Sequence, residues 1–90
     1  MIKAKIFVTL KEGILDPQGR AVQQSLQTLG FSSVEDVRIG KFLEVEVRET
    51  EKSAAEFQVK SMCEKLLANP VIENYRYELT EVPTSPYKDG

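Results

Sequence analysis

The alternation of hydrophobic and polar residues predicts three strands and two helices along the chain. Near the start, Ala4, Ile6, Val8 and Leu10 share one parity, and mostly polar residues occupy the other. This period of two is typical of a strand with one buried face. Phe7 lies on the mixed face, where we expect an exposed ring that can pack against a partner.

The corner between the first strand and the first helix carries the clearest local signals. Asp16 is a suitable N-cap, because its side chain can accept a hydrogen bond from an amide that the first turn leaves free. Pro17 follows at the first helical position, where its fixed φ suits the helix. Apolar residues recur at helical spacing as far as Leu29, and Gly30 can end the helix in the left-handed conformation. These signals predict a helix over 17–29.

The segment 34–48 is predicted to form one long strand. Its apolar residues occupy odd positions, and most of its charged residues occupy even positions. A two-residue hairpin at Gly40 and Lys41 would split the apolar set between two faces, because the side-chain period of a sheet is two. The unbroken parity favours a single strand, bulged or bent at Gly40. A hairpin with a three-residue loop would also keep the parity and remains the alternative.

A second helix is predicted over 53–68 and a last strand over 71–80. Ser53 and Glu56 have the spacing of a capping box, and Pro70 disfavours a helical conformation in the residue before it. The segment 83–90 is rich in Pro and Ser and is predicted to be a flexible tail. The buried stripe of the second helix is expected to comprise Ala55, Val59, Met62, Cys63, Leu66 and Leu67.

The order β-α-β-α-β predicts an α+β fold with a long, bent central strand, in a single domain over 1–82. If the central strand divides, the pattern becomes the ferredoxin-like β-α-β-β-α-β arrangement. Two helices are expected on one face of a mainly antiparallel sheet. Because a chain of 90 residues buries only about 60–65% of its unfolded surface, its own core is thin. We therefore expect self-association that covers the sheet edges.

The charge balance argues against nucleic-acid and membrane partners. Twelve basic and fourteen acidic residues are interleaved, with a net charge of −2, so no basic footprint is expected. No segment approaches the roughly 20 apolar residues that cross a bilayer, and no signal peptide is predicted. With Cys63 as the only cysteine, these features predict a cytoplasmic protein without an intramolecular disulfide.

Most residue types of catalytic and metal sites are missing from the sequence. The chain has no histidine, so catalytic triads and Cys–His dyads are excluded and a structural zinc site is disfavoured. Cys63 lies on an apolar stripe and is expected to be a small buried hydrophobe. An acylphosphatase-like enzyme is disfavoured, because Glu12 stands where a phosphate would bind. No catalytic, cofactor-binding or metal-binding residue is predicted.

Four segments between Ile2 and Val82 follow the order and spacing of a known family. They are V-T-L-K-E-G-I-L-D-P-Q-G-R-A-V, L-G, V-E-D-V-R-I-G-K-F-L-E-V-E-V and L-L-A-N-P-V-I-E-N-Y. Together they resemble the PurS subunits of phosphoribosylformylglycinamidine (FGAM) synthase. The resemblance implies a non-catalytic small subunit in de novo purine biosynthesis. Such a subunit assembles a synthetase (PurL-type) and a glutaminase (PurQ-type) subunit and helps ammonia pass between them. It also implies a homodimer, with a tetramer left open.

The resemblance further implies that ATP, magnesium and glutamine are used by the partner subunits, with no cofactor on this chain. The resemblance also marks a set of surface residues as candidate partner contacts. For each residue alone, capping or a solvated charge is at least as good an explanation. These candidates are Asp16, Gln18, Arg20, Arg38 and Lys41. An ACT-like dimeric module that senses a small molecule is the alternative function, because it shares the two-helix antiparallel layout.

Overall fold

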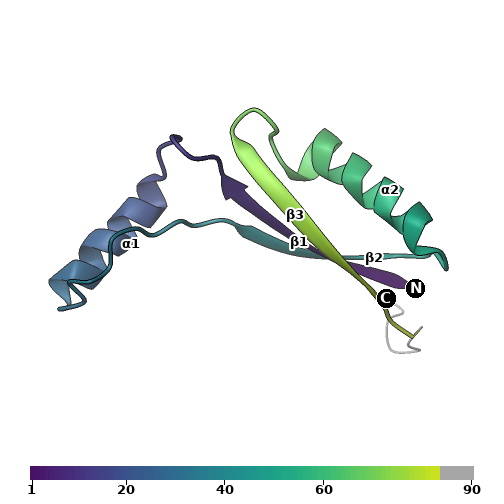
Figure 1. Cartoon of the computed structure of the whole chain (residues 1–90), viewed down its shortest axis with the longest axis horizontal. Coiled ribbons are helices and arrows are strands. Elements are labelled where there is room, and N and C mark those ends of the chain that lie inside the picture. Colours follow the sequence, from purple (N-terminus) through teal and green to yellow (C-terminus); the bar gives the residue numbers. More distant parts are fainter. Residues whose placement is uncertain (84–90) are drawn as a thin grey trace.

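The computed structural model describes residues 1–83, which form a three-stranded antiparallel sheet with two helices (Figure 1). The elements are β1 (Ile2–Leu10), α1 (Pro17–Thr28), β2 (Lys41–Val47), α2 (Lys52–Met62), the π-helical turn η1 (Cys63–Leu67) and β3 (Glu73–Glu81). The predicted α+β class and the order β-α-β-α-β are confirmed. All of the predicted tail except Pro83 lies outside the described residues.

Strand β1 is the centre of the sheet, whose strand order is β2-β1-β3. Ile6 on β1 is opposite Leu43 on β2 and Tyr77 on β3, and both pairings are antiparallel. The apolar parity of β1 supplies the core, because its even-numbered residues from Ile2 to Val8 are fully buried. Helix α2 covers this face. The core cluster comprises Ala4, Ile6, Val8, Val47, Val59, Cys63 and Ala68.

Helix α2 begins one residue earlier than predicted, and the predicted capping box does not form. Glu51 is the N-cap and makes no side-chain capping bond. The Ala55 amide donates to the Glu51 carbonyl at 3.1 Å, which places Ser53 inside the first turn. The hydroxyl at position 53 therefore cannot act as the cap.

The C-terminal end of this helix widens into a π turn, in which the Ala68 amide donates to the Cys63 carbonyl at 2.9 Å. Cys63 is fully buried as predicted, and Leu67 packs against the core. Leu66, however, is 82% exposed. The prediction that Leu66 is buried was wrong, because it assumed a regular α-helical period that the π turn interrupts.

The central segment forms one strand, and within residues 1–83 no hairpin occurs at Gly40. β2 begins only at Lys41, so the predicted single strand is confirmed over its second half. The preceding residues, 34–40, run without helix or strand pairing. A Cβ on Gly40 would lie 2.2 Å from the Val8 carbonyl oxygen. Because β1 approaches so closely, only glycine fits at position 40, next to the first residue of β2 that pairs with β1.

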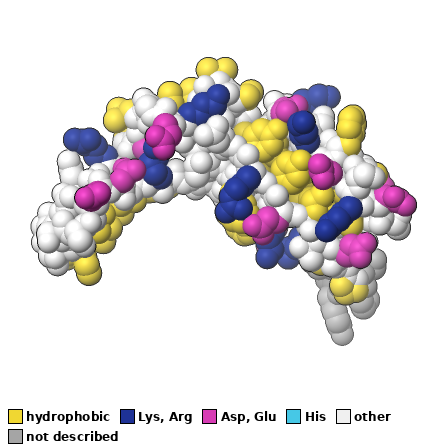
Figure 2. All heavy atoms as spheres, viewed as in Figure 1, with side chains coloured by type: hydrophobic (Ala, Val, Ile, Leu, Met, Phe, Trp, Pro, Cys, Tyr) yellow, Lys and Arg dark blue, Asp and Glu magenta, His cyan; other side chains and the backbone are white. Residues whose placement is uncertain are grey.

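Helix α1 projects away from the sheet and packs beside residues 33–40, so among residues 1–83 α2 is the helix that covers the sheet (Figure 1). We call α1 together with residues 29–40 the arm. Gly19 is the only buried residue of α1, and Leu29 is 73% exposed. Hydrophobic side chains gather on the underside of the arm (Figure 2). The stripe predicted to pack on the sheet is therefore uncovered in a single chain.

Candidate partner interface at the strand-to-helix corner

Asp16 joins the start of α1 to the segment that precedes β2. Its Oδ1 accepts a hydrogen bond from the Gly19 amide at 2.9 Å, which confirms the predicted N-cap. Its Oδ2 accepts a hydrogen bond from the Ile39 amide at 2.8 Å. One carboxylate therefore caps a helix and also holds a segment that lies 23 residues further along the chain.

The surroundings of Asp16 favour its ionised form. The Ile39 amide lowers the pKa of the carboxyl most, and the Gly19 amide adds to the effect, so the pKa lies below the usual 3.8. Partial desolvation opposes this shift, and the nearby Arg38 guanidinium supports it to a smaller extent. The corner is therefore built around a permanently charged carboxylate at neutral pH.

Replacing Asp16 by asparagine is expected to remove an acid-dependent part of the stability. Because the pKa is lower in the folded chain than in the unfolded chain, the ionised carboxylate stabilises the folded state above about pH 4. This contribution is lost as the pH falls through the lowered pKa. Asparagine can still cap Gly19 but does not titrate. Urea unfolding of both proteins should show a stability difference that shrinks in acid, and a difference independent of pH would contradict the prediction.

Gly19 allows the 34–40 segment to lie directly against α1. A Cβ at this position would be 2.2 Å from the Val37 carbonyl oxygen and 2.8 Å from the Asp16 Oδ2. The glycine is thus required by a tertiary contact rather than by the helix itself. The capping of α1 does not require a glycine at position 19, whereas the packing of the 34–40 segment against α1 does.

Arg38 fastens the same segment to the end of β1. Its Nη2 donates to the carbonyl oxygens of Leu10 and Lys11, the second at 3.1 Å. We call Asp16, Gly19, Arg38 and Ile39 the corner cluster. Through it the direction of the arm is fixed relative to the sheet.

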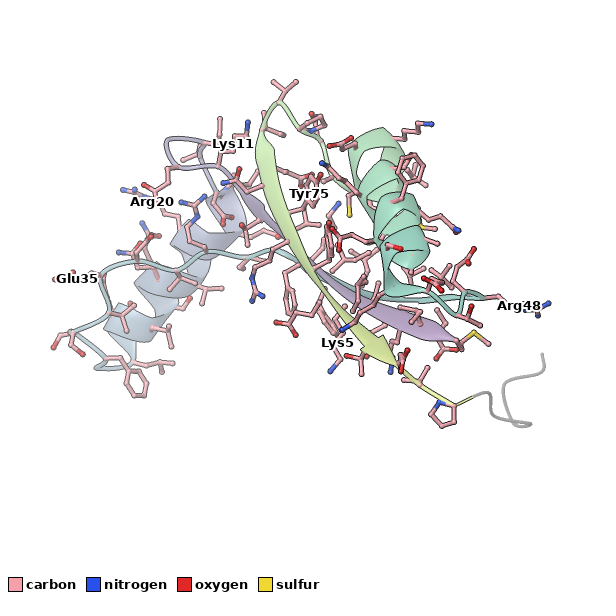
Figure 3. The ribbon with its side chains drawn as sticks, turned by 45° about the vertical axis from the view of Figure 1, so that its right-hand side comes forward. Lys5, Lys11, Arg20, Glu35, Arg48 and Tyr75 are labelled. Carbon is pink, nitrogen blue, oxygen red and sulfur yellow. The ribbon has the colours of Figure 1, made fainter. Side chains whose placement is uncertain are left out.

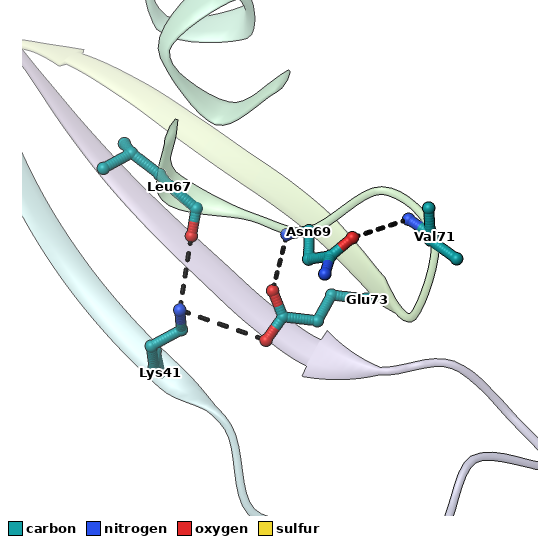
Figure 4. A network of polar contacts seen from close by, with 5 residues as sticks. All are labelled: Lys41, Leu67, Asn69, Val71 and Glu73. Carbon is teal, nitrogen blue, oxygen red and sulfur yellow. Dashed lines mark hydrogen bonds and ion pairs between the residues drawn. The ribbon is translucent and has the colours of Figure 1, made fainter. Parts of the chain in front are cut away.

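Lys41 belongs to a polar network between β2 and the turn before β3 (Figure 4). Its Nζ lies 3.4 Å from the Leu67 carbonyl oxygen and 3.9 Å from the Glu73 Oε2. Glu73 Oε1 accepts a hydrogen bond from the Asn69 amide at 2.7 Å, and the Asn69 side chain accepts one from the Val71 amide at 3.1 Å. The Lys41 side chain is 58% exposed, and that of Glu73 is 17% exposed.

Within this network the Glu73 side chain is expected to contribute more to the free energy of unfolding than the Lys41 side chain. Glu73→Ala leaves the Asn69 amide without its acceptor and should lower the free energy of unfolding by about 1–2 kcal/mol. Lys41→Ala removes a long, exposed ion pair and should cost less than about 1 kcal/mol. Glu73→Gln keeps an acceptor oxygen and is the matched control. Urea titrations would measure all three, and a larger loss for Lys41→Ala than for Glu73→Ala would refute the assignment.

Two hollows flank Asp16 and between them include all five candidate partner contacts. The smaller, of about 170 Å³, lies between α1 and residues 36–38, and Arg20, Asp16 and Arg38 line it. The larger, of about 320 Å³, has Asp16, Gln18 and Lys41 in its wall. The fold thus brings the five residues into one region, although they come from separate parts of the sequence.

The five candidates differ in how they are used by their own chain. Asp16, Arg38 and Lys41 bind groups of this chain, as described above. The side chains of Gln18 and Arg20 form no hydrogen bond or ion pair within residues 1–83. Arg20 lies on the arm, at the opposite end of the molecule from Arg48 (Figure 3). Sequence reasoning missed Glu73, since nothing local indicates that a strand residue caps a preceding turn.

The outer face of the sheet carries an aromatic and charged patch. The rings of Phe7 and Phe42 are 5.1 Å apart, and the Arg76 guanidinium lies 4.0 Å from the Phe7 ring centre. Lys3 and Glu44 form an ion pair at 3.2 Å on the same strands. Phe7 therefore has neighbours from its own chain, and its predicted packing against a partner remains a prediction.

The described residues offer little for catalysis at other positions. Burial raises the pKa of the Cys63 thiol, and the Glu64 carboxylate adds to the rise, so this cysteine is a packed side chain and not a reactive thiolate. No group of three metal-binding side chains occurs within residues 1–83. In the same part of the chain, none of the helices has the length and apolar character that a membrane crossing requires.

Comparisons with known proteins agree on one family. The family model described as "PurS: Phosphoribosylformylglycinamidine (FGAM) synthase" matches residues 3–81. The FGAM synthase subunit PurS of Bacillus subtilis is 52% identical over 82 residues, which cover 91% of this chain and 96% of that protein.

Solved structures extend this similarity to the fold. Methanocaldococcus jannaschii PurS, described as one of the subunits of formylglycinamide ribonucleotide amidotransferase, superposes with a TM-score of 0.81 at 37% identity. The match covers 92% of this chain and all of the other. A chain of the PurLQS structure from Thermotoga maritima gives a TM-score of 0.79 at 30% identity, covering 89% and 99% of the two chains.

Proposed function

The chain belongs to the PurS family of FGAM synthase subunits, and from this premise we propose that it assembles a PurL-type synthetase and a PurQ-type glutaminase into one enzyme. The chain is thereby a subunit of a ligase of purine biosynthesis. The observation that carries the proposal is the similarity, in fold and sequence, to a chain of the PurLQS structure.

The corner provides the surface that we assign to partner binding. The corner cluster fixes the arm through backbone contacts, so the exposed side chains near it are held in a defined position. Gln18 and Arg20 have no bond to their own chain within residues 1–83, and arginine is well suited to bidentate contacts with a carboxylate. Because Asp16 and Arg38 hold the arm and Lys41 binds the turn before β3, Gln18 and Arg20 are the two that we assign to direct contact.

The chemistry in this proposal takes place on the partner subunits. Glutamine supplies ammonia at the glutaminase, and ATP with magnesium activates the substrate at the synthetase. This chain binds no cofactor and contributes by holding the two active sites so that ammonia passes from one to the other. A cytoplasmic location fits this role and the single unpaired cysteine.

We further assign the chain to a homodimer. The arm makes no contact with its own sheet comparable to that of α2, and several large apolar side chains along it are exposed: Val22, Leu29 and Phe31. A second copy would remove this surface from water, which supplies the burial that a small domain lacks. Sedimentation of the isolated chain would distinguish this homodimer from a tetramer.

Co-elution of the three purified subunits tests the proposal. The chain should elute with the synthetase and the glutaminase on a sizing column when ADP, magnesium and glutamine are present. Omitting the chain should abolish glutamine-dependent FGAM formation but leave ammonia-dependent formation by the synthetase. Failure of any ternary complex to form would refute the proposal. Specific binding of an amino acid by the isolated chain, without ternary complex formation, would favour the ACT-like alternative.

A further inference from the structure

Two neighbouring loops bring aliphatic side chains together at the upper end of the sheet. The Lys11 amide donates to the Ile72 carbonyl at 2.8 Å, and the Ile14 amide donates to the Lys11 carbonyl at 3.1 Å. These bonds hold the loop after β1 against the turn before β3 (Figures 1 and 3). The aliphatic residues of the two loops, which we call the apolar ridge, are Ile14, Leu15, Val71 and Ile72.

The apolar ridge is exposed to solvent. Leu15 is 72% exposed and Val71 is 76% exposed, and the two isoleucines are exposed to 36% each. Single exposed apolar residues are ordinary on a protein surface, whereas a contiguous group of them marks a site of interaction. The ridge is such a group, because its two halves are joined through Lys11.

Hydrogen bonds hold both halves of the ridge in a defined conformation. In the turn before β3, the Asn69 side chain accepts a bond from the Val71 amide and the Asn69 carbonyl accepts one from the Ile72 amide, each at 3.1 Å. In the loop after β1, Gly13 adopts a φ of +83° within the turn that the Ile14 amide closes. A surface that is ordered before binding loses less conformational entropy when a partner covers it.

The apolar surface of the arm, which we assigned to the homodimer, faces another way. Its hydrophobic side chains gather on the underside of the arm in Figure 2. The loop after β1 and the turn before β3 instead form the upper edge of the molecule in Figure 1. A second copy seated on the underside of the arm therefore leaves the apolar ridge uncovered.

The ridge is continuous with the corner that we assigned to partner binding. Ile14 and Leu15 line the hollow of about 170 Å³ that Arg20 also lines. A group that enters this hollow meets aliphatic side chains and a guanidinium together. This combination fits an apolar surface that carries a carboxylate at its edge.

Of the two partner subunits, the synthetase fits the ridge better. Permanent interfaces are more hydrophobic than transient ones. In the proposed function the synthetase can work with ammonia alone, whereas the glutaminase is needed only when glutamine is the nitrogen donor. A permanently exposed aliphatic surface is therefore matched to the constant component of the enzyme.

We propose that the apolar ridge inserts into an apolar groove of the synthetase, with a carboxylate at the edge of that groove facing Arg20. The inference rests on the proposed function and specifies which surface binds which subunit. Burial of the four aliphatic side chains supplies the hydrophobic part of the affinity, and the ion pair at Arg20 fixes the orientation.

Photo-cross-linking within the complete complex identifies the occupant of the ridge. p-Benzoylphenylalanine incorporated at position 71 should form a covalent product with the synthetase when the three subunits are mixed. The same probe at position 57 is the matched control, since Phe57 is 77% exposed but lies on α2, and it should give no such product. A product of the position 71 probe with the glutaminase or with a second copy of this chain would overturn the assignment.

Substitutions on the ridge give an independent readout. Leu15→Asp and Val71→Asp should each weaken binding about tenfold or more in a titration with synthetase and glutaminase, because a charge replaces a side chain that becomes buried. Leu15→Met keeps an apolar side chain of similar volume and should stay within about twofold of the unmodified chain. Phe57→Asp makes the same kind of change away from the ridge and should also bind normally. An equal loss for Phe57→Asp would contradict a specific role of the ridge.

The outcomes separate this inference from the proposed function. If the unmodified chain forms no ternary complex, the proposed function itself fails. If that complex forms but Leu15→Asp and Val71→Asp enter it as tightly as the unmodified chain, only the ridge is excluded. Sedimentation and circular dichroism of the isolated variants should show an unchanged homodimer and fold, because both side chains are mostly exposed in the free chain. A variant that lost the homodimer would identify the ridge as a contact between copies and overturn the proposal.

Discussion

Replacing Gly19 by alanine is expected to lower the free energy of unfolding by about 1–3 kcal/mol, the opposite of the usual effect. Glycine inside a helix normally costs roughly 0.5–1 kcal/mol relative to alanine, so this substitution would stabilise an ordinary helix. Here the new Cβ would lie 2.2 Å from the Val37 carbonyl oxygen, a backbone atom that cannot move without displacing the 34–40 segment. Urea unfolding would measure the change.

The same substitution should also impair assembly. Moving residues 34–40 away from α1 breaks the contact between Asp16 and Ile39, so the arm loses its fixed direction. Ser25→Ala, at an exposed position of the same helix, is the control and should change stability by no more than about 0.5 kcal/mol. If Gly19→Ala were as stable as the unmodified chain, the close approach of Val37 would not constrain this position.

Reversing the charge at Arg20 is expected to weaken the ternary complex about 10- to 100-fold while leaving the isolated chain folded. Arginine is over-represented among the residues that dominate interface energies, and truncating such a residue commonly costs 2 kcal/mol or more. Because the Arg20 side chain has no partner within residues 1–83, Arg20→Glu removes no bond of the free chain. Titration of the variant into a mixture of synthetase and glutaminase would give the affinity.

Arg48→Glu is the matched control for Arg20→Glu. It makes the same change of charge on an exposed residue at the other end of the molecule (Figure 3). A loss of affinity that is equal for both variants would reflect the overall charge and not a contact at the corner. An Arg20→Glu variant that assembles normally would exclude Arg20 from the interface. Gln18→Ala should show a smaller loss in the same assay, because it removes a neutral hydrogen-bonding group.

Local sequence signals were sufficient to predict those features that depend on residues close together in the chain. Asp16 and Pro17 begin α1, and Gly30 adopts a left-handed φ of +104° just after its end, as predicted. The parity of β1 likewise identified its buried face. These outcomes depend on hydrogen bonds and steric preferences within a few residues, which a sequence displays directly.

Other predictions failed or were incomplete because contacts between distant segments decide them. The π turn after Met62 exposes Leu66 although the helical period predicts burial. The amphipathic pattern of α1 correctly indicates an apolar face, but it cannot say whether that face packs on the same chain. In the structure α1 extends away from the sheet. The amphipathic pattern would be the same if α1 packed on its own sheet or on another chain.

The sequence by itself determined the order of the elements, the buried face of the sheet and, through its motifs, the family. Only the tertiary structure showed why Gly19 and Gly40 are glycines. It alone also showed which candidate residues bind their own chain and which do not. It showed that Asp16 and Arg38 hold the arm, whereas the side chains of Gln18 and Arg20 make no hydrogen bond or ion pair within residues 1–83. The physical reason is that a periodic pattern reports local conformation and burial, while a 2.2 Å approach or a carboxylate shared between two segments exists only after the chain folds.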